Sequence, residues 1–508
     1  MTILHSTDGR IVPHSRGAAL ACGAAAVLGG LVYLNALHNP FVYDDYHTIL
    51  TNTSIGRVTD LRAIVLHDVT RPLVNLSYAL DRALWGEQPF GFHVTSVLLH
   101  VLTVALLFAF TRRLAGTMAA FAAAALLAVH PMMTEAVGYV SGRSEVLCAV
   151  FFLLALMAGH RWLHGDGAKW GGLTIALWAA TLATKELGAM FPFVLLGYDL
   201  LVVRPAPIER RRRLLAVHLP LIGTAVLAGL IRVVILTRIE SPGQAGIHWT
   251  YVLIAADVVR RYLGLMVNPT GQALFHEVAR IDGAFEWRAA FALLAVAAVA
   301  ALACTLRRVD GVASFGIVWF LVLLVPSAAL TVLDQGEPMA EHRVYLAACG
   351  LFLAAGEGLA RLHGWAAGAG RGMRRLVPIV LTLLILSLGA DTLVRNAIWR
   401  SPVALWRESV NLAPNHYRPR LLLGEALQDA GRHDEAVDEY RIAIRLRPTE
   451  VTGYLKLGAL LAVMGRFPEA RQQLLTVTSL DPQNAPARQA LAILDQGQSR
   501  TGGHDGRR

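Results

Sequence analysis

Residues His93–Pro131, HVTSVLLHVLTVALLFAFTRRLAGTMAAFAAAALLAVHP, decide the fold of this chain. Two apolar runs, 93–111 and 117–131, flank one pair of cations, Arg112 and Arg113. Apolar runs of this kind, bounded by basic residues, are typical of helices that cross a membrane. A bilayer core offers the backbone no water, so a helix that pairs its own N–H and C=O groups can cross it. The stretch predicts two spanning helices joined by a short basic loop.

The same pattern recurs along most of the chain. Of its 508 residues, 55% are hydrophobic and 16% are charged, and the mean hydropathy is +0.49. Soluble globular proteins have a smaller hydrophobic share and a larger charged share. We expect an all-α, polytopic membrane helix bundle of about eleven spans, at 17–37, 93–111, 117–131, 145–163, 169–184, 186–203, 214–236, 287–306, 311–331, 343–361 and 375–395. The fifth and sixth form either a tight hairpin or one broken helix. The first lacks a clear cleavage site before Tyr33 and is expected to remain as an anchor.

Basic residues are concentrated in alternate loops. They are Arg112 and Arg113; Arg161 and Lys169; Arg210 to Arg213; Arg307 and Arg308; and Arg371, Arg374 and Arg375. Because cytoplasmic loops retain cations, residues 1–16 are expected in the cytoplasm. The first outer loop, about 38–92, and the whole C-terminal part then lie on the other side. The net charge of +10 is therefore a topology signal and does not indicate nucleic-acid binding.

The four cysteines, Cys22, Cys148, Cys304 and Cys349, all lie in apolar spans. Free cysteine behaves as a small hydrophobic residue. We therefore expect core residues here, and neither disulfides nor metal ligands.

Beyond the membrane domain, 17–400, the chain becomes charged and repetitive. Gly424, Ala436 and Pro448 recur 34 residues later as Gly458, Ala470 and Pro482, which is the tetratricopeptide period. We expect a tetratricopeptide-repeat α-solenoid over 401–496, with a capping helix at 485–496 and a disordered tail at 497–508. Such arrays bind peptides or proteins in a concave groove. The alternative is a module that only packs on the membrane domain.

Polar residues gather in the loops on the expected outer side. NPFVYDDYHTIL, 39–50, carries the adjacent acids Asp44 and Asp45. Other outer segments carry Arg71; His130, Glu135 and Arg143; Lys185 and Glu186; and Glu341, His342 and Arg343. Charges at the edge of a membrane are costly, and adjacent acids repel unless a cation or donor faces them. We expect one shared polar site, although internal ion pairs, an interfacial anchor and a helix cap at His130 are structural alternatives.

Five of these motifs occur in one order along the chain: NPFVYDDYHTIL, RPLVNLSYALDRALWG, HPMMTEAVGYVSGRSEVL, TKELGAM and EHRVYLA. In that order they resemble the transmembrane O-mannosyltransferases that carry tetratricopeptide repeats, and their bacterial relatives. The resemblance covers nearly the whole chain. It implies a polytopic GT-C glycosyltransferase that takes a sugar such as mannose from a polyprenyl-phosphate donor. The chain departs from the family in two ways. After the Glu-Arg pair the family usually continues YLPS, whereas this chain reads YLAACG, and His342 separates Glu341 from Arg343.

The resemblance also implies roles for the polar residues. Asp44 or Asp45 would take the proton of the acceptor hydroxyl, with Asp44 the first choice and Asp45 orienting the acceptor or holding a cation. Contacts to the donor phosphate would come from Arg71, Arg143, Lys185 and Arg343. Supporting contacts, or contacts to sugar hydroxyls, would come from His130, Glu135, Glu186, Glu341 and His342. One displacement at the anomeric carbon predicts inversion, and the use of a divalent cation is left open.

The expected partners are the lipid bilayer, a polyprenyl-phosphate sugar and a protein or peptide acceptor held by the repeats. The Ala- and Arg-rich composition favours a bacterial inner membrane, with the site and the repeats facing the periplasm. Two other functions stay open. One is a membrane-anchored scaffold for cell-envelope assembly, and the other is a transporter or flippase of lipid-linked sugars. The second is less favoured, because the acids lie in outer loops and not at mid-membrane.

Overall fold

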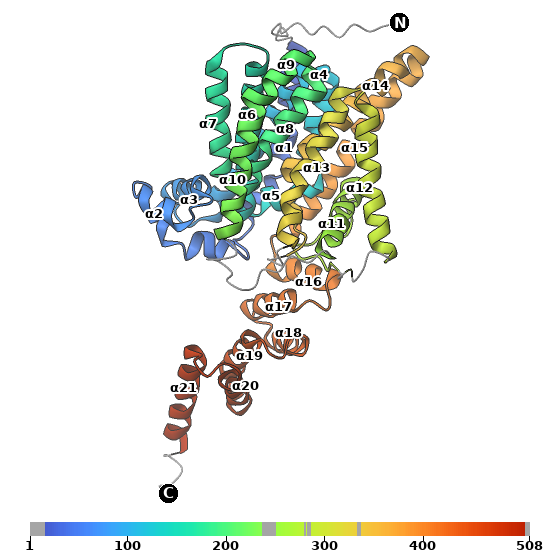
Figure 1. Cartoon of the computed structure of the whole chain (residues 1–508). Coiled ribbons are helices and arrows are strands. Elements are labelled where there is room, and N and C mark those ends of the chain that lie inside the picture. The colour runs from blue at the N-terminus through green and yellow to red at the C-terminus, as the bar shows by residue number, and fades with distance from the viewer. Residues whose placement is uncertain (1–15, 236–249, 279–280, 282–285, 333–336, 503–508) are drawn as a thin grey trace. The chain divides into compact units, whose positions relative to one another are not determined.

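The computed structural model describes residues 16–235, 250–278, 281, 286–332 and 337–502. All regular elements in these ranges are helical, which confirms the all-α prediction. The described chain forms two compact units (Figure 1). The membrane unit runs to Gln272 and resumes from Val278 to Arg400, and the repeat unit begins at Ser401 and includes the short segment Ala273–Glu277.

The membrane unit contains α1 (Arg16–Leu31), α2 (Leu61–His67), α3 (Pro72–Trp85), α4 (Pro89–Val129), α5 (Thr134–Gly138), α6 (Arg143–Leu163), α7 (Ala168–Leu182), α8 (Phe191–Tyr198), α9 (Pro207–Arg213), α10 (Leu219–Ile235), α11 (Thr250–Val267), α12 (Trp287–Leu306), α13 (Gly311–Val332), α14 (Tyr345–Ala369) and α15 (Arg371–Ile398). In the described ranges, eight helical segments are long and apolar enough to cross a membrane. Each predicted span nevertheless coincides with a helix. The totals differ because α4 contains two predicted spans, and because α7 and the apolar run Gly311–Ser327 of α13 are shorter.

The α4 segment folds back on itself. Gly116, at φ 81°, interrupts the helix in a conformation that favours glycine. His100 Nε2 lies 3.5 Å from the Ala128 carbonyl oxygen, whereas a straight helix would separate these residues by about 42 Å. The two arms are therefore antiparallel, and Arg112 and Arg113 lie beside the turn. The predicted pair of spans is confirmed.

Other details of the membrane unit refine or correct the predictions. α7 and α8 are separate helices, and the Trp178 indole N–H donates to the Gly188 carbonyl oxygen, in the turn between them, at 2.9 Å. Between the predicted spans 214–236 and 287–306 lies a further helix, α11, whose Asp257 pairs with two arginines one turn later. Cys148 and Cys349 are buried as expected, but Cys304 is exposed on α12 and is no core residue.

The first outer loop is a small folded layer and not an open chain. Phe41, Ile49, Ile64 and Tyr78 form a hydrophobic cluster with Phe92 at the start of α4. Polar contacts add to it, since the Asn52 amide donates to Asn75 Oδ1 at 2.9 Å. The loop that carries the double acid is therefore fixed on the end of the bundle.

The repeat unit contains α16 (Pro402–Leu412), α17 (Tyr417–Asp429), α18 (His433–Leu446), α19 (Val451–Val463), α20 (Phe467–Leu480) and α21 (Ala485–Gly502). The α19–α20 pair repeats the α17–α18 pair at a distance of 34 residues. A side chain at Gly424 would lie 2.5 Å from the Tyr440 ring, which explains glycine at this position. The last helix continues to Gly502, beyond the predicted boundary at 496, and residues 503–508 lie outside the described chain.

Close backbone contact between α13 and α14 depends on two glycines. A Cβ atom at Gly350 would lie 2.6 Å from the Gly316 carbonyl oxygen. We predict that Gly350→Ala destabilises the protein by about 1–3 kcal/mol, because the helices must separate. The measurement is the thermal unfolding midpoint in detergent. Gly358→Ala, on the same helix with open space around the new Cβ, is the control. Equal midpoints for the two variants would contradict the prediction.

Candidate active site

The two ends of the membrane unit differ in character (Figure 1). The arginine-rich helix α9 lies at one end, and α2, α3 and α5 lie at the other. Most of the candidate site residues belong to segments at this second end: the loop before α2, the start of α3, the residues 131–145, the turn after α7 and the residues before α14. The acids and cations are therefore separated from the main arginine clusters by the length of the bundle.

The two adjacent acids have different environments. The Asp45 carboxylate is fully buried and accepts hydrogen bonds from the Val42 N–H at 3.1 Å, the Ser141 N–H at 2.8 Å and the Ser141 hydroxyl at 2.6 Å. Asp44 is exposed, and its own N–H donates to the Tyr139 hydroxyl at 3.0 Å. Tyr43, the residue directly before the two acids, has a φ of 52°, a conformation that costs energy in a non-glycine residue. The backbone is thus held so that one acid points in and the other out.

Residues 131–142 act as the support of this loop. The segment comprises the short 3-10 helix Pro131–Met133, α5 and the 3-10 helix Val140–Gly142. A Cβ atom at Gly142 would lie 2.5 Å from the Glu135 carbonyl oxygen, so the compact turn requires glycine. Tyr139 also stacks on Trp399, with ring centroids 5.6 Å apart. This segment holds Asp44 and Asp45 through Tyr139 and Ser141, carries Glu135 and leads into α6, which carries Glu145.

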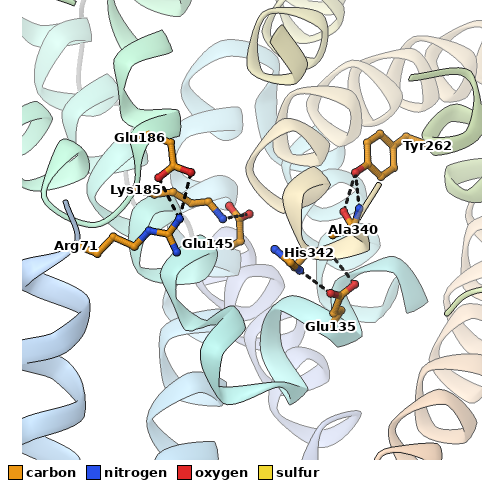
Figure 2. Close-up of polar contacts among 8 residues, drawn as sticks. All are labelled: Arg71, Glu135, Glu145, Lys185, Glu186, Tyr262, Ala340 and His342. Carbon is orange, nitrogen blue, oxygen red and sulfur yellow. Dashed lines mark hydrogen bonds and ion pairs between the residues drawn. The ribbon is translucent and has the colours of Figure 1, made fainter. Parts of the chain in front are cut away.

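Two ion pairs lie beside this support (Figure 2). Arg71, at the start of α3, places Nη2 3.2 Å from both oxygens of Glu186. Lys185 Nζ lies 2.5 Å from Glu145 Oε1 in a buried pair. The other Glu145 oxygen is buried and has no hydrogen-bond partner in the described chain. The Arg71 guanidinium has a raised pKa, chiefly because of the Glu186 charge. Both cations are paired with carboxylates.

A second polar group continues from these pairs (Figure 2). His342 Nδ1 lies 2.5 Å from Glu135 Oε1, and the His342 backbone N–H donates to Glu135 Oε2 at 3.2 Å. The Tyr262 hydroxyl donates to the Ala340 carbonyl oxygen at 2.7 Å. Glu341 is fully buried and accepts from the Gln272 amide at 2.9 Å. One polar region therefore contains six of the predicted residues: Arg71, Glu135, Lys185, Glu186, Glu341 and His342.

Two predicted residues are occupied by contacts of their own. Arg143 is completely buried; it pairs with Asp81 at 2.6 Å and lies over the Tyr78 ring at 4.9 Å. His130 receives the Met132 N–H at Nδ1 and donates from Nε2 to the Met266 carbonyl oxygen. These contacts match the structural alternatives of an internal ion pair and a helix cap. Arg343 is half-buried, and its guanidinium donates to the Glu337 carbonyl oxygen at 2.8 Å.

Several contributing residues were not among the predicted ones. Tyr139, Ser141 and Glu145 lie inside the HPMMTEAVGYVSGRSE motif, but nothing in their spacing indicates which of them faces the loop. Tyr262 lies on α11 and Gln272 follows it, in the part of the chain between the predicted spans 214–236 and 287–306. Among the described residues, no three His, Cys, Asp or Glu side chains gather in a way that could hold a metal ion.

Comparisons with known proteins agree with the resemblance seen in the motifs. A family model described as dolichyl-phosphate-mannose-protein mannosyltransferase matches residues 69–236. Protein O-mannosyl-transferase TMTC3 of Mus musculus is 23% identical over 91% of this chain and 55% of its own length. Protein O-mannosyl-transferase TMTC1 of Homo sapiens is 27% identical over 88% of this chain and 58% of its own length. The resemblance to O-mannosyltransferases is confirmed, and the chain spans just over half the length of these relatives.

A shorter and stronger match falls on part of the chain. Protein O-mannosyl-transferase Tmtc1 of Drosophila melanogaster is 36% identical over 32% of this chain and 20% of its own length. Among solved structures, ArnT from Cupriavidus metallidurans bound to undecaprenyl phosphate is 17% identical over 92% of this chain and 80% of that one, with a TM-score of 0.40. A TM-score this low carries no argument about function.

The buried Asp45 predicts how stability depends on pH. Burial raises the pKa of its carboxyl from 3.8 to about 7, against the opposing hydrogen bonds from Ser141 and Val42. The folded protein then holds a proton here that the unfolded chain loses near pH 4, so stability falls as the pH rises through about 4 to 7. We predict a loss of roughly 3 kcal/mol between pH 5 and pH 8, absent in Asp45→Asn. Unfolding midpoints across this range test it; parallel curves for the two proteins would rule it out.

Proposed function

We propose that this chain is an inverting membrane glycosyltransferase of the GT-C class. It moves a sugar, such as mannose, from a polyprenyl-phosphate donor to a hydroxyl of a protein Ser or Thr on the extracytoplasmic face. The observation that carries the proposal is that one short segment, 131–145, supports the loop that exposes Asp44 and also carries two acids, Glu145, which pairs with Lys185, and Glu135, which holds His342. The similarity to O-mannosyltransferases supports the same reaction class.

Asp44 is the proposed general base. A neutral hydroxyl is a weak nucleophile, so a carboxylate must accept its proton as the new bond to the anomeric carbon forms. The bond from that carbon to the phosphate oxygen breaks on the opposite face, which inverts the configuration. Asp44 is the better candidate of the two acids because it is exposed. Both Asp45 oxygens already accept hydrogen bonds, so Asp45 positions Asp44 through the shared backbone.

The departing phosphate is the proposed ligand of Arg71, Lys185 and Arg343. Fixed cations stabilise the charge that builds on the leaving oxygen. Arg71 and Lys185 are paired with Glu186 and Glu145, so a phosphate would compete with carboxylates for them. Arg143 is not included, because its guanidinium is fully buried against Asp81 and two aromatic rings. The unpartnered oxygen of Glu145 is a natural acceptor for a sugar hydroxyl.

The surroundings of the reaction follow from the same argument. The arginine-rich end of the bundle suits the cytoplasmic side, which would place the site at the periplasmic face of a bacterial inner membrane. The lipid donor would be a polyprenyl phosphate already embedded in the bilayer. The helix pairs of the repeat unit would recruit the protein acceptor.

Transfer from a defined donor tests the proposal. Purified protein in nanodiscs, given radiolabelled polyprenyl-phosphate mannose and an acceptor peptide, should release polyprenyl phosphate and label the peptide with an inverted linkage. We predict that Asp44→Asn lowers the rate by at least about 100-fold, since a general base is worth 10²–10⁴.

Asp60→Asn is the matched control. Asp60 lies in the same loop and caps α2 by accepting from the Ala63 N–H at 2.9 Å, a task that asparagine also performs. It should retain the wild-type rate. Full activity of Asp44→Asn would exclude Asp44 as the base. No transfer by the wild type, with partner binding lost on removal of 401–508, would favour a membrane-anchored scaffold.

A further inference from the structure

We infer that His342, held by Glu135, binds the phosphate of the lipid donor through Nε2 and takes up a proton when the phosphate binds. The inference rests on the proposed function, because it names a further residue of the same phosphate site. It assigns His342 a direct contact with the reacting molecule instead of a supporting one.

The Glu135 carboxylate fixes the orientation of the ring. One oxygen lies 2.5 Å from His342 Nδ1, and the other accepts the backbone N–H of the same residue at 3.2 Å. A carboxylate beside Nδ1 selects the tautomer that carries its hydrogen on Nδ1. Nε2 is then the basic nitrogen. It has no hydrogen-bond partner in the described chain, and the side chain is 22% exposed where that of Glu135 is 2% exposed.

Nε2 faces a group of charges. Figure 2 shows the second ring nitrogen directed toward the Lys185–Glu145 pair, away from Glu135. Besides the Glu135 carboxylate, four charged groups act on the ring: Lys185 after α7, Glu145 on α6, Arg343 on its own segment and Arg71 at the start of α3. Three of these four are cations. They oppose a further positive charge on the ring, and they attract an anion to the same place.

A bound phosphate reverses this balance. An anion between Nε2 and the cations favours the protonated ring, because the imidazolium then lies between the phosphate and the Glu135 carboxylate. Binding therefore draws one proton from solvent onto Nε2. Lysine and arginine side chains bind their protons more strongly than an imidazole does, so Lys185, Arg71 and Arg343 do not supply that proton.

The protonated ring acts in the proposed transfer. As the acceptor oxygen bonds to the anomeric carbon, the carbon–oxygen bond to phosphate breaks and its electron pair stays on the phosphate oxygen. The phosphate charge rises from one to two. Nε2–H donates a hydrogen bond to this oxygen, and a charge-assisted hydrogen bond is stronger than a neutral one. The acceptor proton goes to Asp44, and the ring returns its own proton to solvent when the lipid phosphate leaves.

The test is the pH dependence of binding of a lipid phosphodiester. The probe is farnesyl methyl phosphate, which carries one charge throughout pH 5.5–8.5, with the full chain in nanodiscs. We predict that wild-type affinity falls as the pH rises, by up to tenfold per unit. Calorimetry in two buffers of different ionisation heat should show net proton uptake on binding, largest at the acidic end of this range.

Variants assign the proton to the ring. His342→Gln should bind the probe with a flatter pH profile and without proton uptake, and Glu135→Gln should reduce both effects. His164→Gln, at an exposed histidine beyond the C-terminal end of α6, should keep the wild-type slope. Because Asp45 titrates in the same range, the difference between wild type and His342→Gln is the decisive quantity.

The outcomes separate the inference from the proposed function. Wild-type binding without a pH slope or proton uptake would overturn the role of His342. The role of His342 would also be overturned if His342→Gln, with an unchanged unfolding midpoint, keeps both the pH slope and the proton uptake. If transfer from the labelled donor still occurs and still depends on Asp44, the proposed function stands without this residue. If the wild type neither binds the diester nor transfers sugar, both fail.

Discussion

The hydrogen bonds to the Asp45 carboxylate are the constraint on which the outer end of this protein depends. They join the first outer loop to the segment 131–142 through Ser141, two pieces of chain that are about 96 residues apart. Burying a carboxylate without such donors would be prohibitively costly. With them, the loop has one position, and Asp44 is presented on its outside. The same segment carries Glu135 and leads to Glu145, so Asp44, the His342 ring and Lys185 depend on one support.

The polar region as a whole obeys a simple electrostatic rule. Buried charges are tolerated when they are paired, and here Glu145 pairs with Lys185, Glu186 with Arg71 and Asp81 with Arg143. The three pairs differ in what they leave available. Arg143 is enclosed, whereas Arg71 is part-exposed and Glu145 retains an unpartnered oxygen. In the proposed reaction, an anionic lipid at the membrane edge would meet cations that are already in place, and the site would exchange one anion for another without creating a new charge.

Prediction from the sequence was most successful where a segment satisfies itself. Each apolar run became a helix because its backbone hydrogen bonds are internal, and the 34-residue spacing of Gly424 and Gly458 became two equivalent helix pairs. Prediction was weakest where charged and apolar residues alternate within one segment. The helix α11 combines Asp257, Arg260 and Arg261 with a buried face, so these charges interrupt the apolar run by which a span is recognised although its contacts are those of a helix. The prediction that Cys304 is a core residue was wrong for a similar reason, since an apolar span does not indicate which of its faces is inward.

The sequence by itself determined the helical class, the order of the spans, the basic and acidic ends and the residues from which a site could be made. These properties follow from local composition and period, which each segment carries with it. The tertiary structure alone decided which acid of the Asp44–Asp45 pair is exposed, that Arg143 is enclosed, and that His342 meets Glu135 across 207 residues of chain. Those distinctions depend on distance and burial, because a carboxylate or an imidazole acquires its chemistry from the groups that face it.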